Sequence, residues 1–379
     1  MTDAALFTPL TIRGVTFRNR VMVSPMQQYM AERDGLPNAF HAQHYGRQAI
    51  GGAGTVMTEA LGVTPEGRVT WHDLGIWTDE QAETLKPIAE TLGAAGAVPA
   101  TQLIHAGRKG SVGRPWEGYN PLSEADAARG FPPWPTLAAS AAPANPGWHE
   151  PRAMDEDDIA RTIDAYHAAT RRAARAGFRF LEIHAAHGYL IHSFLSPLSN
   201  RREDRWGGDR AGRMRFLLAV TEAVRAAWPG DLPLSVRLSC IDDQPEGWTL
   251  EDSVAAACAL KALGVDLVDC SSGGLGERTT TRMIRRPEGY QVPFAERIRE
   301  AAGVPTIAVG LITTPAFADA VIREGRADIV AIGREALFNP HWALHAAQAL
   351  GADPGFSDWH PSWGWWLEKR ARAARAPAQ

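Results

Sequence analysis

The sequence predicts an α/β protein built as a single (β/α)8 (TIM) barrel. Short, continuous apolar runs alternate with longer amphipathic stretches along the 379 residues, and continuous runs are typical of parallel strands buried on both faces. Eight such repeats in a chain of this length favour a closed barrel over a doubly wound sheet. A Rossmann fold would need Gly-x-Gly-x-x-Gly after its first strand, and Ser24, Pro25 and Met26 stand there instead.

The strands are expected at the apolar runs and the helices between them. One helix is predicted over 155–176, where four consecutive acidic residues suit the positive end of the helix dipole. Two more are predicted over 250–263 and 314–324. The predicted strands are 20–23, 54–59, 98–103, 179–183, 234–238, 267–270, 306–309 and 329–332.

Two segments fall outside this repeat. The segment 110–151 is rich in Pro, Gly and Trp, and loops of that length are usually functional or carry structure of their own. We expect it to be an excursion that caps the mouth of a barrel domain spanning 1–366, whose last part is Trp-rich. The remaining residues, 367–379, are basic and Ala-rich, and we expect a flexible tail there.

Composition excludes several classes of function. A formal net charge of −4 lacks the basic excess of nucleic-acid binders, so no nucleic-acid partner is expected. No apolar run approaches the ~20 residues that span a bilayer, and the first residues lack the layout of a signal peptide. The three cysteines have no metal-ligand spacing, which indicates reduced thiols. We therefore expect a cytoplasmic protein without a membrane partner.

Chemically active side chains follow the predicted strands, where the active site of such a barrel forms. The fourth strand runs directly into His184, His187 and Tyr189. As neutral donors, the two histidines could hold a developing oxyanion, and Tyr189 could protonate a carbanion-like centre. Arg237 lies within the fifth strand. Because an unpaired buried guanidinium is costly, we expect it to meet a carboxylate or a cofactor that becomes negative on reduction.

These residues also have plainer interpretations. His184 and His187 could bind zinc, with His105 or His192 as a further ligand, although the spacing of a known zinc motif is not evident. One histidine could instead be a core residue with satisfied hydrogen bonds, and Tyr189 could form an aromatic wall. A metal-dependent barrel hydrolase therefore competes with the oxyanion hypothesis at this point.

The last two strands end in glycine. Gly310 follows the seventh strand, and Gly333 follows the eighth with Arg334 beside it. Glycine lets backbone N–H groups approach an anion, a helix start adds a favourable dipole, and an arginine adds a charge-assisted contact. The two loops predict a phosphate site, the alternative being that the glycines only turn the chain.

Several ordered motifs resemble the old yellow enzymes, the family of FMN-dependent ene-reductases. The resemblance runs from about residue 6 to residue 366, and it is strongest to the thermophilic-like class that contains xenobiotic reductases. The motifs lie at 19–26, 102–109, 184–189, 196–202 and 332–334.

The resemblance implies a non-covalent FMN that NADPH or NADH reduces and that passes hydride from flavin N5 to the β-carbon of an α,β-unsaturated carbonyl compound. It implies that His184 and His187 bind the carbonyl oxygen, that Tyr189 protonates the α-carbon and that Tyr29 lines the substrate pocket. The implied FMN residues are Pro25, Met26, Ala60, Gln102 and Arg237 around the ring, with Ser24 and Gln27 beside them, and Gly310, Gly333 and Arg334 at the phosphate, with Ser272 and Lys109 as secondary candidates.

One position departs from the class. Relatives carry a cysteine after Pro-Met in the first loop, near flavin N5 and O4, where this chain has Gln27. A glutamine cannot form a thiolate, but its amide can donate to flavin O4. We therefore expect a flavin potential and a substrate preference that differ from those of cysteine-bearing relatives.

The end of the chain bears on assembly. Its Trp-rich stretch resembles that of xenobiotic reductases, where a tail residue reaches a pocket, sometimes that of the neighbouring subunit. We expect a homodimer or higher homo-oligomer, in which Trp366 lines the site of its own or the neighbouring chain or packs at an interface. The alternative function is a flavin-dependent desaturase or demethylase on the same scaffold, which would move hydride from substrate to flavin.

Overall fold

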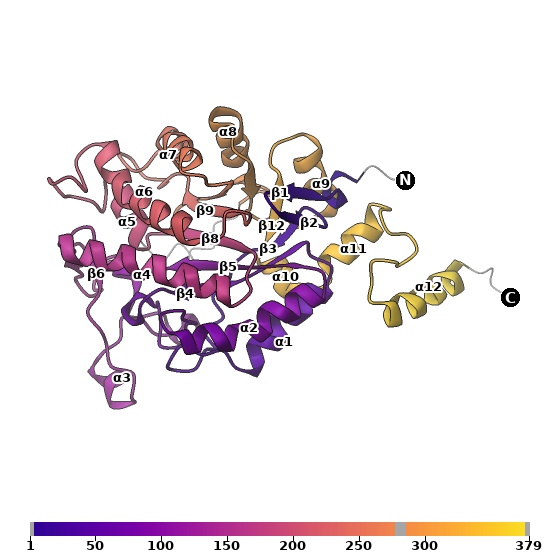
Figure 1. Ribbon diagram of the computed structural model, residues 1–379, viewed down its shortest axis with the longest axis horizontal. Coiled ribbons are helices and arrows are strands. Elements are labelled where there is room, and N and C mark those ends of the chain that lie inside the picture. Colours follow the sequence, from indigo (N-terminus) through magenta and orange to yellow (C-terminus); the bar gives the residue numbers. More distant parts are fainter. Residues whose placement is uncertain (1–3, 277–285, 376–379) are drawn as a thin grey trace.

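The chain forms a closed parallel barrel surrounded by helices, as the computed structural model shows (Figure 1). The structure describes residues 4–276 and 286–375. Within them, neighbouring barrel strands follow each other in chain order, and the last strand returns to pair with the first. The strands are β3 (Val21–Val23), β4 (Thr55–Gly62), β5 (Val98–Ile104), β8 (Phe180–Ala185), β9 (Leu234–Ser239), β10 (Leu267–Ser271), β11 (Thr306–Ala308) and β12 (Ile329–Ile332).

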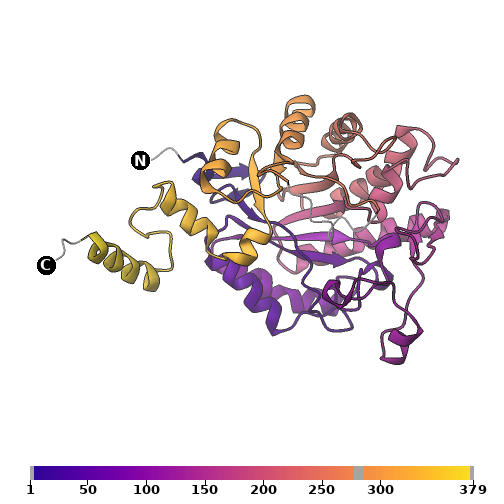
Figure 2. The same ribbon diagram turned by 180° about the vertical axis from the view of Figure 1, so that it is seen from behind.

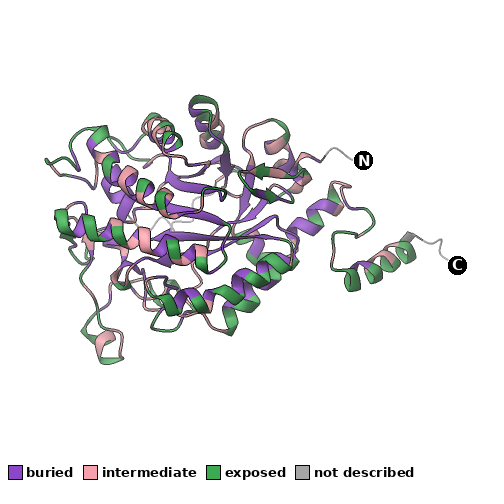
Figure 3. Cartoon of the chain, in the orientation of Figure 1, coloured by how far each residue is buried: buried purple, intermediate pink, exposed green. Residues whose placement is uncertain are grey.

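All neighbouring pairs in the barrel are parallel. Every residue of the eight strands is buried, while the outward faces of the helices are exposed (Figure 3). Side chains on one face fill the barrel and those on the other meet the helices, which explains the continuous apolar runs. The predicted (β/α)8 barrel and its eight strands are confirmed.

Helices follow the strands, and the three predicted ones are confirmed. The helix predicted over 155–176 begins after Asp155, whose carboxylate accepts the backbone N–H of Asp158 at 2.8 Å and so caps the helix. No helix in the described ranges is long and apolar enough to cross a bilayer. The helices around the barrel are α1 (Ala39–Ile50), α2 (Asp79–Ala94), α4 (Glu156–Arg175), α5 (Leu190–Leu195), α6 (Arg210–Ala227), α7 (Leu250–Ala262), α8 (Val292–Ala302), α9 (Pro315–Arg323), α10 (Arg334–Phe338) and α11 (Trp342–Ala349).

A small hairpin precedes the barrel and was not predicted. The short helix η1 (Ala5–Phe7) is followed by the antiparallel strands β1 (Leu10–Ile12) and β2 (Val15–Phe17). Strands of three residues are too short to show an alternating pattern. The hairpin is nevertheless anchored, because Phe17 packs edge-on against the ring of Phe180 in β8 at a centroid distance of 5.6 Å.

The excursion carries structure of its own. It contains η4 (Pro115–Glu117), α3 (Glu124–Ala128) and β6 (Leu137–Ala138), and β6 pairs with β7 (Arg152–Ala153) just beyond its predicted end. Helix α3 stands out from the body in both ribbon views (Figures 1 and 2). Other parts bind the loops after β4 and β5: Trp134 Nε1 donates to Glu66 O at 3.1 Å, and Arg108 Nη1 donates to Ala142 O at 3.3 Å.

The end of the described chain is helical, which the sequence analysis did not predict. Helix α12 (Pro361–Arg375) runs through the predicted domain boundary at 366 and into the segment expected to be a flexible tail. The second half of this helix consists mainly of the strong helix formers Ala, Arg, Lys, Glu and Leu. This composition indicates a helix, but its basic character led to the expectation of a flexible tail. The helix lies away from the barrel in both ribbon views (Figure 2). Residues 376–379 lie outside the described ranges.

One buried side chain joins the first two barrel strands at their amino ends. Asn19 Nδ2 donates to Gly52 O at 2.9 Å. Its Oδ1 accepts the backbone N–H groups of Val21 at 3.1 Å and Gly54 at 2.9 Å. One amide thus binds three backbone groups at the entry to β3 and β4, of which the Gly54 N–H also donates to Val21 O at 2.9 Å.

We predict that Asn19→Ala lowers the free energy of unfolding by about 1–3 kcal/mol, because it leaves buried backbone groups without partners. Urea unfolding followed by circular dichroism measures the change. Thr11→Ala, at an exposed position of the hairpin, should change it by less than about 0.5 kcal/mol. Equal effects of the two substitutions would contradict the assigned role of Asn19.

Candidate active site

A cavity of about 400 Å³ opens at the carboxyl end of the barrel. Each barrel strand or the loop after it contributes to the lining, as expected for this fold. Its walls bring together most of the residues singled out from the sequence. These are Ser24, Pro25, Met26, Gln27, Tyr29, Ala60, Gln102, His184, His187, Tyr189, Arg237, Gly310, Gly333 and Arg334.

Three predicted residues are not in the lining. Ser272 lies behind it, where its hydroxyl accepts a hydrogen bond from Gln291 Nε2 at 3.1 Å. Lys109 is a neighbour of the histidines rather than of the phosphate loops, as described below. Trp366 lies on α12 with 66% of its surface exposed and does not reach the cavity of its own chain.

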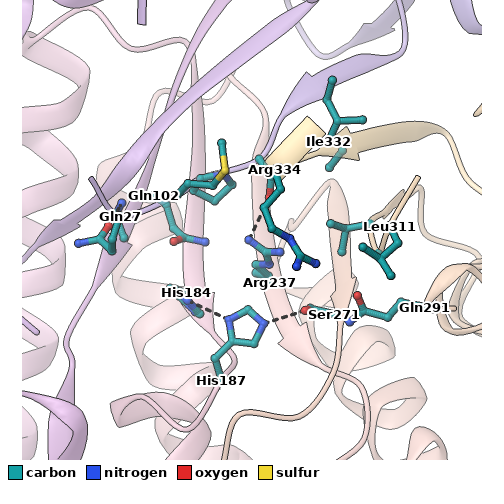
Figure 4. A pocket seen from close by; sticks show the side chains of 18 of the residues that line it. Gln27, Gln102, His184, His187, Arg237, Ser271, Gln291, Leu311, Ile332 and Arg334 are labelled. Atoms are coloured by element: carbon teal, nitrogen blue, oxygen red, sulfur yellow. Dashed lines mark hydrogen bonds between the residues drawn. The ribbon is translucent and has the colours of Figure 1, made fainter. Parts of the chain in front are cut away.

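The two histidines form a chain of hydrogen bonds across the cavity wall (Figure 4). His184 Nδ1 accepts the Ala186 backbone N–H at 3.2 Å, so its proton sits on Nε2. This Nε2–H faces His187 Nδ1 at 3.4 Å. His187 Nε2–H in turn donates to Ser271 Oγ at 2.7 Å. The partners therefore assign the Nε2–H tautomer to both rings.

Both imidazoles are neutral in this site. Burial lowers the pKa of His184 and His187 well below the usual histidine value, and the charge of Arg237 lowers both further. Lys109 acts in the same direction. The histidines therefore act as hydrogen-bond donors and not as cations near neutral pH.

The backbone that carries His187 is held in an unfavourable conformation. Its φ is +60°, a region that residues other than glycine rarely occupy. The His187 N–H donates to Ser239 Oγ at 2.9 Å, and Lys109 Nζ donates to the carbonyl oxygens of His187 at 2.8 Å and Gly274 at 2.9 Å. These bonds fix the turn, and strain retained in this way is typical of functional sites.

Tyr189 stands beside the histidines. Its ring meets that of His184 edge-on at a centroid distance of 4.9 Å, and Lys109 Nζ lies 5.2 Å from its centroid. Burial raises the pKa of Tyr189, which keeps the phenol protonated at neutral pH, while a hydrogen bond from Tyr119 partly offsets the rise. Burial lowers the pKa of Lys109 to about 8, with Arg108 as the lesser cause.

Arg237 occupies the floor of the cavity. Its Nε lies 3.3 Å from Asp269 Oδ2, and its Nη1 donates to Ser24 Oγ at 3.3 Å. The sequence left open whether this guanidinium meets a carboxylate or a cofactor. The structure supplies the carboxylate and also leaves Arg237 in the cavity lining, so both kinds of partner are compatible with its position.

Gln27 has a fixed orientation. Its Oε1 accepts the Ala60 backbone N–H at 2.7 Å. The other end of the amide, Nε2, is buried and has no partner in the described part of the chain. A buried donor of this kind requires an acceptor, and Gln27 faces the cavity beside Gln102 (Figure 4).

The far end of the cavity is shaped for an anion. Gly310 has a φ of +117°, and a Cβ there would lie 2.7 Å from Gln291 Oε1, so only glycine fits. Gly333 caps the amino end of α10, whose first residue is Arg334. Backbone N–H groups and one guanidinium thus meet where the phosphate was predicted.

Sequence reasoning missed part of the lining. Ser271 closes the histidine chain, and Gln291 Nε2 donates to its hydroxyl at 3.1 Å. The position of Ser271 at the end of a predicted strand was an available signal, whereas Gln291 lies 20 residues further on, beyond any strand-end rule. The other missed residues are Ile104, Tyr290, Val309, Leu311, Ile312, Thr313, Ala331, Ile332 and Glu335.

The lining fits FMN. An amphipathic ring needs apolar contacts together with a few fixed hydrogen-bond partners, and the wall offers Met26 and Ala60 beside the free amide N–H of Gln27. Arg237 provides a positive charge at the floor, and Arg334 provides another at the anion end. The arrangement therefore suits a planar ring at one end and a phosphate at the other.

The zinc interpretation finds no support among residues 4–276 and 286–375, where no three or more His, Cys, Asp or Glu side chains are placed to hold a metal ion. The two further ligands considered have other partners. His105 Nδ1 accepts the Gly107 N–H at 3.1 Å, and His192 Nε2 lies 3.0 Å from Asp242 Oδ1.

Comparison with known proteins gives concordant results. Residues 5–353 match the model of the NADH:flavin oxidoreductase / NADH oxidase family. An NADPH dehydrogenase of Geobacillus thermodenitrificans is 45% identical over 350 residues, which cover 92% of this chain and 95% of that protein. An old yellow enzyme homologue from Zymomonas mobilis aligns with a TM-score of 0.74 and 29% identity over 92% of this chain and 93% of that one. Morphinone reductase aligns with a TM-score of 0.74 and 28% identity over 91% and 89%.

We predict that His184 and His187 stay neutral Nε2–H tautomers from about pH 6 to pH 9, because burial and Arg237 oppose their protonation. Nitrogen-15 NMR of histidine-labelled protein measures this. Since the chain has 12 histidines, the signals are assigned by loss in His184→Gln and in His187→Gln. Titration of either ring near the usual histidine pKa would show that the electrostatic account is wrong.

Proposed function

The chain belongs to the NADH:flavin oxidoreductase / NADH oxidase family, that of the old yellow enzymes, and within this family we propose that it is an ene-reductase. It is an oxidoreductase that uses FMN with NADPH or NADH. The proposed reaction is reduction of the C=C bond of α,β-unsaturated carbonyl compounds. The observation that carries this proposal is the pair of neutral histidines beside a protonated tyrosine in one open cavity.

The residues proposed to hold FMN are those of the lining described above. When bound, FMN supplies the hydride transfer between the nicotinamide and the substrate. Arg237 and Gln27 meet the polar edge of the ring, and Pro25, Met26 and Ala60 provide contacts to its apolar part. The phosphate is proposed to lie against Gly310, Gly333 and Arg334, with Ser24 and Gln102 completing the ring site.

His184 and His187 are proposed to bind the carbonyl oxygen of the substrate. The bond between His184 Nε2–H and His187 Nδ1 is long, at 3.4 Å, and therefore weak. A carbonyl oxygen in the cavity can replace it at low cost. The freed His184 Nε2–H then donates to this oxygen and stabilises the negative charge that develops on it as hydride reaches the β-carbon. With the oxygen bound, His187 is proposed to add a second N–H as its Nδ1–H tautomer, while Ser271 Oγ donates to its Nε2.

Tyr189 is proposed to protonate the α-carbon. Its raised pKa keeps the proton on the phenol until a strongly basic carbon forms next to it. The phenolate left behind is stabilised by the hydrogen bond from Tyr119 and by the positive charge of Lys109, 5.2 Å from the ring centroid. The excursion, which supplies Tyr119, thus contributes to the proton-transfer step as well as to the proposed cap.

Tyr29 is proposed to form the outer wall of the substrate pocket. It lines the cavity and packs edge-on against Trp116 of the excursion at 5.9 Å. We also propose a homodimer or higher homo-oligomer. Helix α12 carries Trp366 away from its own barrel, so this residue is proposed to act at a neighbouring subunit.

The proposed function is tested by anaerobic absorption spectroscopy of the holoenzyme. NADPH should bleach the flavin band, and cyclohexenone should restore it. In Tyr189→Phe the bleaching should be unchanged, while substrate turnover should fall by roughly 10²–10⁴-fold because the general acid is lost. A flavin band that NADPH does not bleach would instead favour the desaturase or demethylase direction. Normal turnover by Tyr189→Phe would exclude Tyr189 as the proton donor.

Gln27 is expected to set the flavin potential. Its amide is fixed with Nε2 free to donate, and a donor to flavin O4 stabilises the electron-rich reduced ring. We predict that Gln27→Cys lowers the midpoint potential and changes the relative rates with different enones. Gln27→Met, which removes the amide without adding a thiol, separates the two effects. An unchanged potential and substrate profile in Gln27→Cys would refute this role.

A further inference from the structure

A second group of charged side chains lies inside the barrel, below the cavity. Glu182 of β8 and Asp269 of β10 are fully buried, and we call them the interior carboxyl pair. Arg237 of β9 lies between their strands. In the barrel register Arg237 is opposite Asp269, and Glu182 is opposite Gln102 of β5. The proposed reaction uses Arg237 and Gln102 but neither carboxyl group.

The contacts of the interior carboxyl pair are specific. Gln102 Nε2 donates to Glu182 Oε1 at 2.8 Å, and Ser235 Oγ donates to Glu182 Oε2 at 2.8 Å. Asp269 has no such donors in the described chain, and its one charged partner there is Arg237 at 3.3 Å. Glu182 is therefore held by neutral groups and Asp269 by a cation.

Charge balance requires a proton at this place. Two ionised carboxylates and one guanidinium would leave a net negative charge on two carboxyl groups that are both fully buried, which is strongly unfavourable. Neighbouring buried carboxyl groups relieve this by retaining a proton. Burial, and then the charge of Asp269, raise the pKa of Glu182 to about 8, while Arg237 favours ionisation of both acids. The 3.3 Å contact with Arg237 favours the ionised form of Asp269, so the proton is assigned mainly to Glu182.

We propose that the interior carboxyl pair carries one proton in total, mainly on Glu182, and that occupancy of this proton site is coupled to the redox state of the flavin through Arg237. Glu182 is then a positioning and charge-balancing residue for the cofactor and not a catalytic one. The inference requires the FMN chemistry of the family but neither the enone reaction nor the proton donor Tyr189.

The coupling follows from the place of Arg237 between the two sites. Two electrons supplied by NAD(P)H make the cofactor more negative, and negative charge near Arg237 favours the protonated form of the pair. Near pH 7 Glu182 is already protonated, so nothing is taken up. Above about pH 8 it is partly ionised before reduction. Each two-electron reduction then draws up to one proton from water onto the Glu182 carboxylate, with no other bond formed or broken in the protein.

Because proton binding and reduction are thermodynamically linked, uptake of this proton changes the pH dependence of the midpoint potential. Uptake of one extra proton per two electrons changes the reduction equilibrium tenfold per pH unit, which adds about 30 mV per unit to the slope. The extra slope should be absent near pH 7 and present above about pH 8. Among the described residues, the charged groups that act on Glu182 are Asp269 and Arg237. His184, two residues further along β8, is neutral over this range.

The experiment is spectroelectrochemical titration of the FMN-loaded enzyme from about pH 6.5 to pH 10. Wild-type protein should show the steeper slope above about pH 8. Glu182→Gln keeps the size of the side chain but cannot titrate, and it should lose the extra slope with little change of potential near pH 7. Lys109, whose pKa is also lowered to about 8, is retained throughout, so its contribution cancels in the comparison.

Two further variants complete the design. Asp269→Asn removes the like charge and frees Arg237, so the potential near pH 7 should become more positive and the steep region should move to lower pH. Asp328→Asn is the matched control, because it removes a carboxylate paired with Arg299 at 2.9 Å far from the cavity, and it should leave the wild-type profile unchanged.

The experiment tests the proposal even if one of the variants fails to fold. A wild-type profile that does not steepen above about pH 8 overturns the proposal even if Glu182→Gln fails to fold. Equal slopes in wild type and Glu182→Gln overturn it as well. A protein that binds no FMN would contradict the flavin function itself, which is a separate result, whereas failure of the enone reaction alone would leave this measurement intact.

Discussion

The buried charge of Arg237 is the constraint on which the site depends. Arg237 belongs to a barrel strand, and 7% of the residue is exposed. Its positive charge affects the protonation of the ionisable groups around it. It is the second cause, after burial, of the lowered pKa of both His184 and His187, and it holds Asp269 as its counter-ion. One cation thus opposes protonation of the histidines above it and favours ionisation of the carboxyl group below it, which separates the cavity into a neutral upper wall and a charged floor.

The fold was predictable because burial on both faces of the barrel strands leaves a direct trace in the sequence. Each continuous apolar run became a strand, since all residues of these strands are buried. The hairpin before the barrel left no such trace, because it is too short for a period to appear. Helix α12 was missed for another reason. Its Trp-rich start and its basic end differ in composition and were interpreted as two separate segments, although helix-forming residues continue across the boundary.

Much of the candidate site was predictable from one rule, that strand ends meet at one rim. Residues such as Gln102, His184 and Arg334 needed only that rule and the strand positions. What the rule could not give is how these side chains pair. Whether Arg237 meets a carboxylate depends on the register that sets Asp269 opposite it, and the bond from His187 to Ser271 depends on a turn with positive φ. Gln291 and Tyr119 enter from long segments whose path only the structure shows.

The division between a neutral wall and a charged floor also explains how oxyanion binding can be insensitive to pH while the cofactor site is sensitive to it. His184 is oriented by the backbone N–H of Ala186, and the turn that carries His187 is held by Ser239 and Lys109. Oxyanion binding then depends on fixed dipoles and not on a titrating cation. The carboxyl proton that is proposed to respond to added charge lies at the floor, where Glu182 and Asp269 share the field of Arg237. Arg237 faces both regions. A change in the protonation of the carboxyl pair therefore alters the electric field at the histidines, and their hydrogen bonds need not rearrange.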